Sequence, residues 1–138
     1  MTIQISSETR QKLIAMAQAA RQHAYSPYSH YPVGAALLSA KGAIFTGCNV
    51  ENASYGGTIC AERTALVKAV SEGVRQFVAI AVVTENGGAP CGLCRQVLYE
   101  FGPAMLVIVA DPEGRIVHEC PLNELLPLGF GPQQLGER

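Results

Sequence analysis

The chain begins with an amphipathic pattern that predicts a helix over residues 8–24. Apolar residues recur there every three or four positions, which places them on one face of a helix. Ser6 or Ser7 precedes the pattern and can cap its first turn. Pro27 disfavours helix in the residue before it and therefore closes the segment. The apolar stripe consists of Leu13, Met16, Ala17, Ala20 and Ala24.

Five short apolar runs farther along the chain predict β-strands, and the first two flank a glycine-containing turn, as in a β-hairpin. The predicted strands cover residues 33–39, 43–48, 77–83, 105–110 and 115–118. Two segments between them predict helices, and one helical turn follows the last strand. These helical segments cover residues 60–72, 91–101 and 123–126. Gly73 after the first and Gly102-Pro103 after the second are residue types that end helices.

The order of these elements, α-β-β-α-β-α-β-β, is typical of an α/β domain. It predicts a mixed sheet of about five strands with helices on its faces. The length of 138 residues corresponds to one domain, over residues 1–138. A chain of this size buries about two thirds of its surface on folding, so its core needs no disulfide support.

Composition and charge exclude several classes of protein. Hydrophobic residues make up 49% of the chain and charged residues 15%, which excludes intrinsic disorder. So low a charged fraction favours an oligomer that covers part of the apolar surface. Ten basic and eleven acidic residues give a net charge of −1 without a basic run, so we expect no nucleic-acid partner.

We also expect neither a membrane span nor a secretory signal. The longest apolar runs are too short to cross a bilayer, and residues 1–12 contain no apolar signal-peptide core. These features favour a cytoplasmic protein. In that compartment the five cysteines are thiols or metal ligands rather than a disulfide framework.

Three of the cysteines stand where two predicted helices begin. Cys91 and Cys94 are three residues apart and therefore share one face of the first turn of their helix, while Cys60 opens the preceding helix. Helix N-termini stabilise thiolates through their free N–H groups and partial positive charge. Three thiolates that meet at one point make a site suited to Zn²⁺.

Glu62 adds an acid–base group to this cysteine set. A catalytic zinc ion typically has three protein ligands and a water molecule, whereas a structural ion has four protein ligands. The two-residue spacing from Cys60 makes Glu62 a poor fourth ligand, but its carboxylate can reach a water molecule beside the metal, as general acid–base hydrolysis requires. Cys48 and Cys120 have no partner at ligand spacing and are interpreted as buried small apolar residues.

Each part of this pattern has a plainer interpretation when taken alone. A single Cys-x-x-Cys is as often redox-active or structural as catalytic, and a single Cys-Ala-Glu carries no information. Together, at the starts of two helices with a strand between them, they favour a catalytic zinc site. The histidines are not at ligand spacing, and we interpret His23, His30 and His118 as ordinary surface or partly buried residues.

At these residues the sequence resembles the small, homotetrameric cytidine deaminases that act on free nucleosides. The resemblance extends over nearly the whole chain, and its motifs follow one another in the family's order. Cysteine as the first metal ligand is typical of the tetrameric class, whereas many relatives that edit nucleic acids have histidine there. The matching segments are residues 25–29, 33–38, 47–53, 60–65, 90–96 and 125–127.

The resemblance implies a three-layer α/β/α fold and hydrolytic deamination of cytidine and 2′-deoxycytidine in pyrimidine salvage. It implies one Zn²⁺ per subunit on Cys60, Cys91 and Cys94, with Glu62 as the residue that transfers protons. Three thiolates and Zn²⁺ sum to a charge of −1, which weakens the ion as a Lewis acid. Arg63 is placed to donate to the ligand sulfurs and withdraw charge, and we favour this role over that of a surface cation on a helix.

The resemblance also implies a substrate pocket. Asn49 and Glu51 hold the ribose hydroxyls, since amide and carboxylate groups bond well to sugar hydroxyls. Backbone groups around Ala61 and Pro90 orient the base and its amine. Tyr55 and Phe130 line the pocket, with Phe130 coming from a neighbouring subunit of the homotetramer. Without the resemblance, residues 49–52 form a solvated loop, Tyr55 is ordinary loop packing and Phe130 is buried by the tail.

Two residues depart from the family's usual pattern. Tyr31 stands before Pro32-Val33-Gly34 where the family usually has phenylalanine, and its hydroxyl needs a partner if it is buried. Leu93 replaces the usual alanine between two of the cysteines and should leave the coordination unchanged. Neither change removes a residue that the chemistry needs.

Three other functions stay open on the sequence alone. A deaminase for another aminopyrimidine nucleoside that does not read ribose hydroxyls has no need of Glu51. A deaminase of nucleic acid needs an electropositive groove. A non-catalytic zinc module needs a fourth protein ligand and has no use for Glu62.

Overall fold

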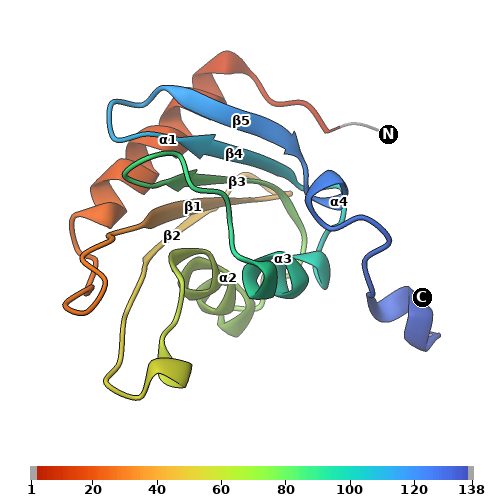
Figure 1. The fold of residues 1–138 in the computed structure, drawn as a ribbon. Helices are drawn as coiled ribbons and strands as arrows, with labels where there is room; N and C mark the ends of the chain where they lie inside the picture. Colours follow the sequence, from red (N-terminus) through yellow and green to blue (C-terminus); the bar gives the residue numbers. More distant parts are fainter. Residues whose placement is uncertain (1–2, 137–138) are drawn as a thin grey trace.

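The computed structural model describes residues 3–136. Its strands form a single mixed sheet in the order β2-β1-β3-β4-β5 (Figure 1). All neighbouring strands are antiparallel except β3 and β4, which are parallel. The strands are β1 (Gly34–Ser39), β2 (Ile44–Cys48), β3 (Phe77–Val83), β4 (Leu106–Ala110) and β5 (Ile116–Pro121).

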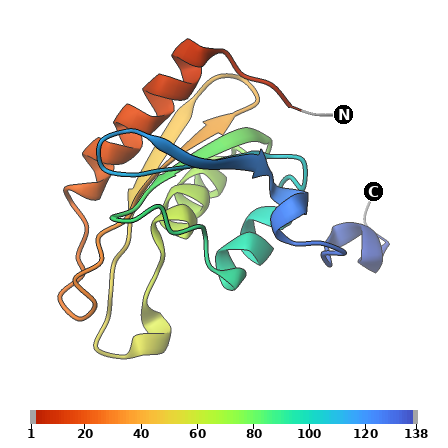
Figure 2. The same ribbon diagram turned by 45° about the horizontal axis from the view of Figure 1, so that its top comes forward.

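Helices cover both faces of the sheet (Figures 1 and 2). One helix, α1 (Ser7–Arg21), packs on one face. The other face is covered by α2 (Ala61–Ser71), α3 (Gly92–Tyr99) and the single turn α4 (Leu122–Leu125). This three-layer α/β/α arrangement confirms the fold class expected from the sequence.

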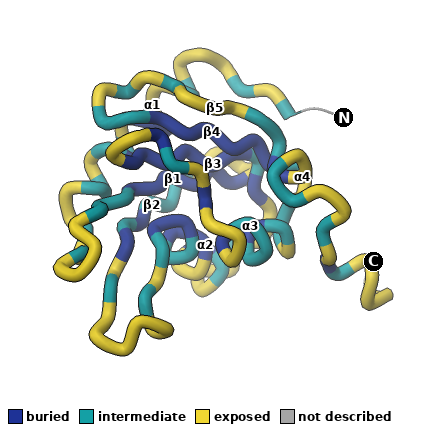
Figure 3. Tube along the Cα trace, viewed as in Figure 1, coloured by how far each residue is buried: buried dark blue, intermediate teal, exposed yellow. Residues whose placement is uncertain are grey.

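The central strands are buried on both faces, as their continuous apolar sequences predict. Every residue of β1 and of β4 is buried, and Figure 3 shows these strands as the dark-blue centre of the molecule. On the α1 side the core contains Leu13, Ile14 and Ala17. The opposite cluster joins Leu66 of α2 and Leu98 of α3 to the sheet.

The predicted elements are all present, with ends that differ by a few residues. Ser6 caps α1 by accepting from Thr9 N at 3.0 Å, but α1 ends at Arg21 rather than residue 24. The reason is tertiary: Tyr25 N donates to Asn49 O, and Tyr25 O accepts from Glu51 N, both at 2.9 Å. These backbone hydrogen bonds hold Tyr25 in an extended conformation, so the helix ends before Pro27.

The last strand also differs from its predicted bounds, because β5 continues three residues beyond His118. The extra residues pair with β4, ending at Pro121 opposite Leu106. Their partners come from another part of the chain, so the local apolar pattern does not mark them. Within residues 3–136 no helix combines the length and the hydropathy that a membrane span requires.

Gly47 positions the start of α2 against the sheet. A Cβ at this position would lie 2.6 Å from Ala65 N and 2.7 Å from Ala61 O. Since such contacts are too short for any side chain, only glycine allows β2 to approach the helix so closely. The first turn of α2, which Cys60 precedes, is thereby held at one end of the β2 strand.

Candidate active site

Three cysteine sulfurs meet where the N-termini of α2 and α3 come together. Cys60 is the N-cap of α2, Cys91 is the N-cap of α3, and Cys94 lies in the first turn of α3. Their Sγ atoms all lie within 4.8 Å of one another. Among residues 3–136 this is the only cluster of three or more histidine, cysteine or acidic side chains able to hold a metal ion, and it contains no fourth such group.

The spacing and chemistry of the sulfurs fit a zinc ion. Zn–S bonds of about 2.3 Å in a tetrahedron place neighbouring sulfurs about 3.8 Å apart, and the Sγ atoms of Cys60 and Cys91 are 3.9 Å apart. Thiolates are soft donors that favour zinc over magnesium or calcium. Three ligands rather than four argue against a purely structural ion.

Arg63 supplies positive charge to the cluster. Its Nη2 lies 3.4 Å from Cys60 Sγ and 3.4 Å from Thr58 O. The side chain therefore points back toward the cysteines from the first turn of α2 instead of into solvent. This placement is the one that charge withdrawal from a ligand sulfur requires.

The protonation of the thiols is set by their mutual contacts. Hydrogen bonds donated by Cys94 and by Arg63 lower the pKa of Cys60 to about 5. The pKa of Cys94 is raised, because its proton is held between the two sulfurs and because the group is buried. The first thiolate thus forms at Cys60, and a metal ion held by these residues would favour the deprotonated form of the other two thiols.

Glu62 is buried beside this cluster, with only 4% of its surface exposed. Burial raises the pKa of its carboxyl group to about 7, and the negative charge of Cys60 raises it further in the same direction. A carboxyl group with a pKa near neutrality can both accept and release a proton, as a general acid–base catalyst must. Glu62 does not belong to the cluster of candidate metal ligands.

A pocket of about 390 Å³ opens directly over these groups. Most of the residues that the sequence predicted for the site line it. They are Asn49, Glu51, Cys60, Ala61, Glu62 and Cys91. The remaining predicted ligand, Cys94, is fully buried below the pocket floor.

Asn49 and Glu51 are held firmly in the pocket wall. The Asn49 amide accepts from Val33 N and donates to Tyr31 O, both at 2.9 Å. The Glu51 carboxylate accepts from the backbone N–H of Tyr28 at 2.9 Å and from the backbone N–H and hydroxyl of Ser29. The Ser29 hydroxyl, helped by both backbone donors, lowers the pKa of Glu51, so this side chain presents a negative charge to the pocket.

Tyr55 and Phe130 lie outside this pocket in their own chain. Tyr55 is 75% exposed and lines an adjoining hollow of about 280 Å³, with its ring 5.8 Å from that of Tyr28. Phe130 is 53% exposed. It belongs to the residues after α4, 126–136, which we call the C-terminal segment and which leave the body of the molecule (Figures 1 and 3). Its expected contribution to a neighbour's pocket stays a prediction.

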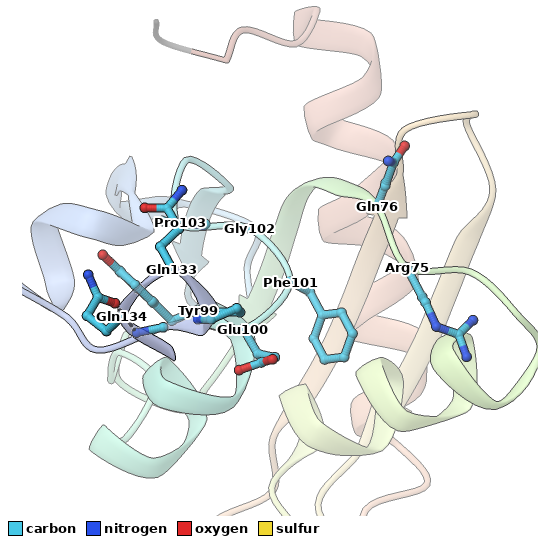
Figure 4. Close-up of a pocket in the computed structure, with 11 residues that line it drawn as sticks. Arg75, Gln76, Tyr99, Glu100, Phe101, Gly102, Pro103, Gln133 and Gln134 are labelled. Atoms are coloured by element: carbon cyan, nitrogen blue, oxygen red, sulfur yellow. Dashed lines mark hydrogen bonds between the residues drawn. The ribbon is translucent and has the colours of Figure 1, made fainter. Parts of the chain in front are cut away.

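The structure has a larger cavity that holds none of the predicted site residues. It measures about 730 Å³ and lies between the end of α3 and the C-terminal segment. Figure 4 shows Arg75 and Phe101 on one side of it and Gln133 and Gln134 on the other. It is lined by neither a cysteine nor Glu62, so the chemistry-bearing residues belong to the smaller pocket.

Sequence reasoning missed several pocket residues, including Ser29, Thr58, Thr84 and Ala89. Ser29 and Thr58 are small polar loop residues with no distinctive spacing. For Thr84 and Ala89 a signal existed, since they lie in the loop that leads directly to Cys91. The other two cysteines, Cys48 and Cys120, are half-buried rather than buried, because each lies on an edge strand of the sheet.

The fold and the site together define a class of α/β/α proteins that gather thiols at two helix N-termini beside a buried carboxyl group. Residues 7–110 match the family model of the cytidine and deoxycytidylate deaminase zinc-binding region. The chain belongs to this family. The family resemblance noted in the sequence is thereby confirmed.

Relatives of known name match nearly the full length of the chain. It is 51% identical to the cytidine deaminase of Sporosarcina psychrophila over 91% of this chain and 93% of the relative. The cytidine deaminase of Halalkalibacterium halodurans is also 51% identical, over 93% of this chain and 98% of the relative. The crystal structure of the Burkholderia pseudomallei cytidine deaminase superposes with a TM-score of 0.83 at 48% identity, covering 91% of this chain and 100% of the other.

Proposed function

We propose that this protein hydrolytically deaminates cytidine and 2′-deoxycytidine, releasing the corresponding uridines and ammonia as a step of cytoplasmic pyrimidine salvage. One domain, residues 1–138, carries this activity. The observation that supports it most strongly is that Cys60, Cys91 and the buried Glu62 line one pocket together with Asn49 and Glu51. The named relatives, which are cytidine deaminases, point to the same substrate.

Cys60, Cys91 and Cys94 would hold one Zn²⁺ ion, which when bound lowers the pKa of a water molecule and makes it nucleophilic at neutral pH. Arg63 donates to Cys60 at 3.4 Å and offsets part of the negative charge of three thiolates. The helix N-termini at Cys60 and Cys91 act in the same direction. These contacts keep the sulfurs ionised without leaving the site strongly negative.

Glu62 transfers the protons of the reaction. Its carboxylate accepts a proton from the attacking water, and the carboxyl group then delivers that proton to N3 of the base. Oxygen adds to C4 and gives a C4 hydroxyl group. Glu62 then passes the proton of that hydroxyl group to the amine, the C4–N4 bond breaks, ammonia leaves, and the C4 carbonyl of the uridine remains. The pKa of about 7 suits a group that must be ionised at one step and protonated at the next.

The remaining pocket residues orient the nucleoside. Asn49 and Glu51 bind the ribose hydroxyls, and the backbone of Ala61 binds the base. Tyr55 and Phe130 complete the pocket, with Phe130 supplied by a neighbouring subunit of a homotetramer. The pocket lining contains neither lysine nor arginine, which favours a free nucleoside over a nucleic acid.

Glu62→Gln tests this proposal, with Glu72→Gln at the exposed end of the same helix as the matched control. Because glutamine cannot carry the proton, Glu62→Gln should lower kcat about 10²- to 10⁴-fold while zinc content stays at one ion per chain. Glu72→Gln should change neither. The measurements are cytidine absorbance and metal analysis. Loss of zinc from Glu62→Gln would make the residue a ligand, and a wild-type protein inactive on cytidine would refute the function.

A further inference from the structure

The hydroxyl group of Tyr31 joins two walls of the pocket. Its Oη donates to Asn86 Oδ1 at 2.7 Å. Tyr31 lines the pocket next to Asn49, whose amide bonds to its carbonyl. Asn86 belongs to the loop of residues 84–90 that runs from β3 to α3, which we call the β3–α3 loop. This loop lines the pocket through Thr84, Gly88 and Ala89.

The backbone of the β3–α3 loop packs directly on this hydroxyl. A Cβ at Gly88 would lie 2.6 Å from Tyr31 Oη, so a side chain there would collide with the phenol. On its other side, the loop meets β5, where a Cβ at Gly87 would lie 2.7 Å from Val117 Cγ2. The loop therefore sits between Tyr31 and Val117 of β5, and a side chain at either glycine would force one of these neighbours to shift.

A second contact links the same two segments, and like the Tyr31–Asn86 bond it is exposed to solvent. Arg21 Nη2 lies 2.8 Å from Glu85 Oε1, and Arg21 Nε donates to Pro32 O at 3.0 Å. The Glu85 side chain is 67% exposed, and exposed ion pairs contribute little to stability. The Tyr31–Asn86 bond differs from the ion pair in joining the loop directly to a residue that lines the pocket.

We propose that Tyr31 is a positioning residue whose hydroxyl sets the distance between the two walls of the substrate pocket. The inference rests on the proposed function, because the wall it places is the one that a pyrimidine nucleoside would touch. The arrangement depends on three residues together: the Tyr31 hydroxyl, the Asn86 side chain that accepts from it, and Gly88, whose missing side chain leaves room for it. The substrate class is a free pyrimidine nucleoside.

Losing the hydroxyl affects binding more than the chemical step. Cys60 and Cys91 are the N-caps of α2 and α3, Glu62 is on α2 and Cys94 is on α3. Because Arg95 of α3 holds Pro90, the last residue of the loop, at 2.7 Å, the reacting groups keep their places when the middle of the loop moves. A loosened wall must be ordered when the substrate binds, and that ordering weakens affinity. One neutral hydrogen bond contributes enough to change KM about threefold to tenfold.

Tyr31→Phe, Asn86→Ala and the double variant test the bond. Each single variant should raise KM for cytidine about threefold to tenfold with kcat within about twofold, and the double variant should match the singles because one bond is lost in every case. Tyr25→Phe is the control, since it removes a phenolic hydroxyl from a side chain that is 55% exposed. Additive effects, or an unchanged KM in Tyr31→Phe, would overturn the proposal.

Gly88→Ala adds a test by rescue. In the natural chain the new methyl group meets the Tyr31 hydroxyl, so KM should rise. Tyr31→Phe removes the colliding atom, so the Tyr31→Phe/Gly88→Ala protein should have a lower KM than Gly88→Ala alone. Failure of this rescue would mean that the hydroxyl does not define the position of the loop.

Hydrogen exchange of the β3–α3 loop tests the inference without any substrate. The peptide covering residues 84–90 should exchange about threefold to tenfold faster in Tyr31→Phe and in Asn86→Ala than in the wild type or in Tyr25→Phe. If the wild type proves inactive on cytidine while this pattern holds, the proposed function fails and the anchoring of the loop stands. Unchanged exchange in both variants would refute the anchoring.

Discussion

The near-neutral pKa of Glu62 results from the surroundings of this carboxyl group rather than from its residue type. Glu62 occupies the first turn of α2, where the helix carries it into the interior beneath the pocket, and 4% of its surface remains exposed. Burial disfavours the charged form and raises its pKa to about 7. The same burial that prepares this group for proton transfer costs the protein stability whenever the group ionises.

The stability of the zinc-free protein should therefore depend on Glu62 in a defined pH range. A folded-state pKa raised from 4.5 to about 7 contributes stability that is fully present below pH 4.5 and is lost as the pH rises through about 7. The loss amounts to about 3 kcal/mol. Glu62→Gln stays neutral and lacks this loss, so it should be the more stable protein at pH 8.

Urea unfolding of both zinc-free proteins at pH 5 and pH 8 measures this difference. Comparing the two proteins removes the effect of Cys60, whose lowered pKa changes stability in the opposite direction as the pH rises. If the difference in unfolding free energy between the wild type and Glu62→Gln is the same at both pH values, the raised pKa of Glu62 is contradicted.

Glu51 and Asn49 make a second prediction at the residue scale. If they bind the ribose, free cytosine should react with a kcat/KM about 10²-fold or more below that of cytidine, because the binding energy of the sugar is lost. Glu51→Ala should lower kcat/KM for cytidine and leave the value for cytosine nearly unchanged. Equal efficiency on cytosine and cytidine would refute this role.

At the scale of elements, α3 holds three other parts of the chain in place. Arg95 Nε donates to Pro90 O at 2.7 Å, and its Nη1 donates to Leu125 O at 2.8 Å. The next residue, Gln96, donates from Nε2 to Phe130 O at 2.8 Å. One turn of α3 thus fixes the residue before Cys91, the end of α4 and the C-terminal segment.

Arg95→Gln should weaken zinc binding about tenfold, because groups that orient ligands of a metal contribute to its affinity. Without the guanidinium, Pro90 and therefore Cys91 lose their anchor on α3. Gln96→Ala is the control, since Gln96 contacts the C-terminal segment and not the loop before Cys91. Competition with a zinc chelator gives both affinities, and equal values for Arg95→Gln and the wild type would contradict this role of α3.

At the scale of the whole molecule, several large apolar side chains face solvent in the single chain. Some lie on the outer surfaces of α2 and α3, and others lie on the C-terminal segment, which extends from the body (Figures 1 and 2). They are Val67, Leu93, Leu128, Phe130 and Leu135. Exposed apolar groups in this number favour burial against further copies of the chain.

If Phe130 completes a neighbour's pocket, assembly and activity are linked. Phe130→Ala should raise KM for cytidine about tenfold, in keeping with the loss of a buried aromatic contact, and leave zinc content unchanged. Dilution below the dissociation range of the assembly should lower specific activity. Light scattering alongside steady-state kinetics measures both, and a monomer with full specific activity would refute a shared site.

The sequence by itself determined the order of the elements, the α/β/α class and the set of cysteines with Glu62. These features depend on local information. Continuous apolar character marks a strand such as Phe77–Val83 as buried, and cysteines three residues apart on a helix share a face wherever that helix lies. The spacing also made Glu62 a poor candidate for a metal ligand, because two side chains that are two residues apart on a helix point in different directions.

Only the tertiary structure decided where α1 ends, how far β5 extends and which groups meet across the pocket. Tyr25 leaves the helix because residues 49–51 pair with it, and Tyr31 reaches Asn86 across 55 positions of sequence. The raised pKa of Glu62 depends on burial by residues distant in the chain. Such contacts depend on how close separate elements pack, a quantity that no local pattern of residues encodes.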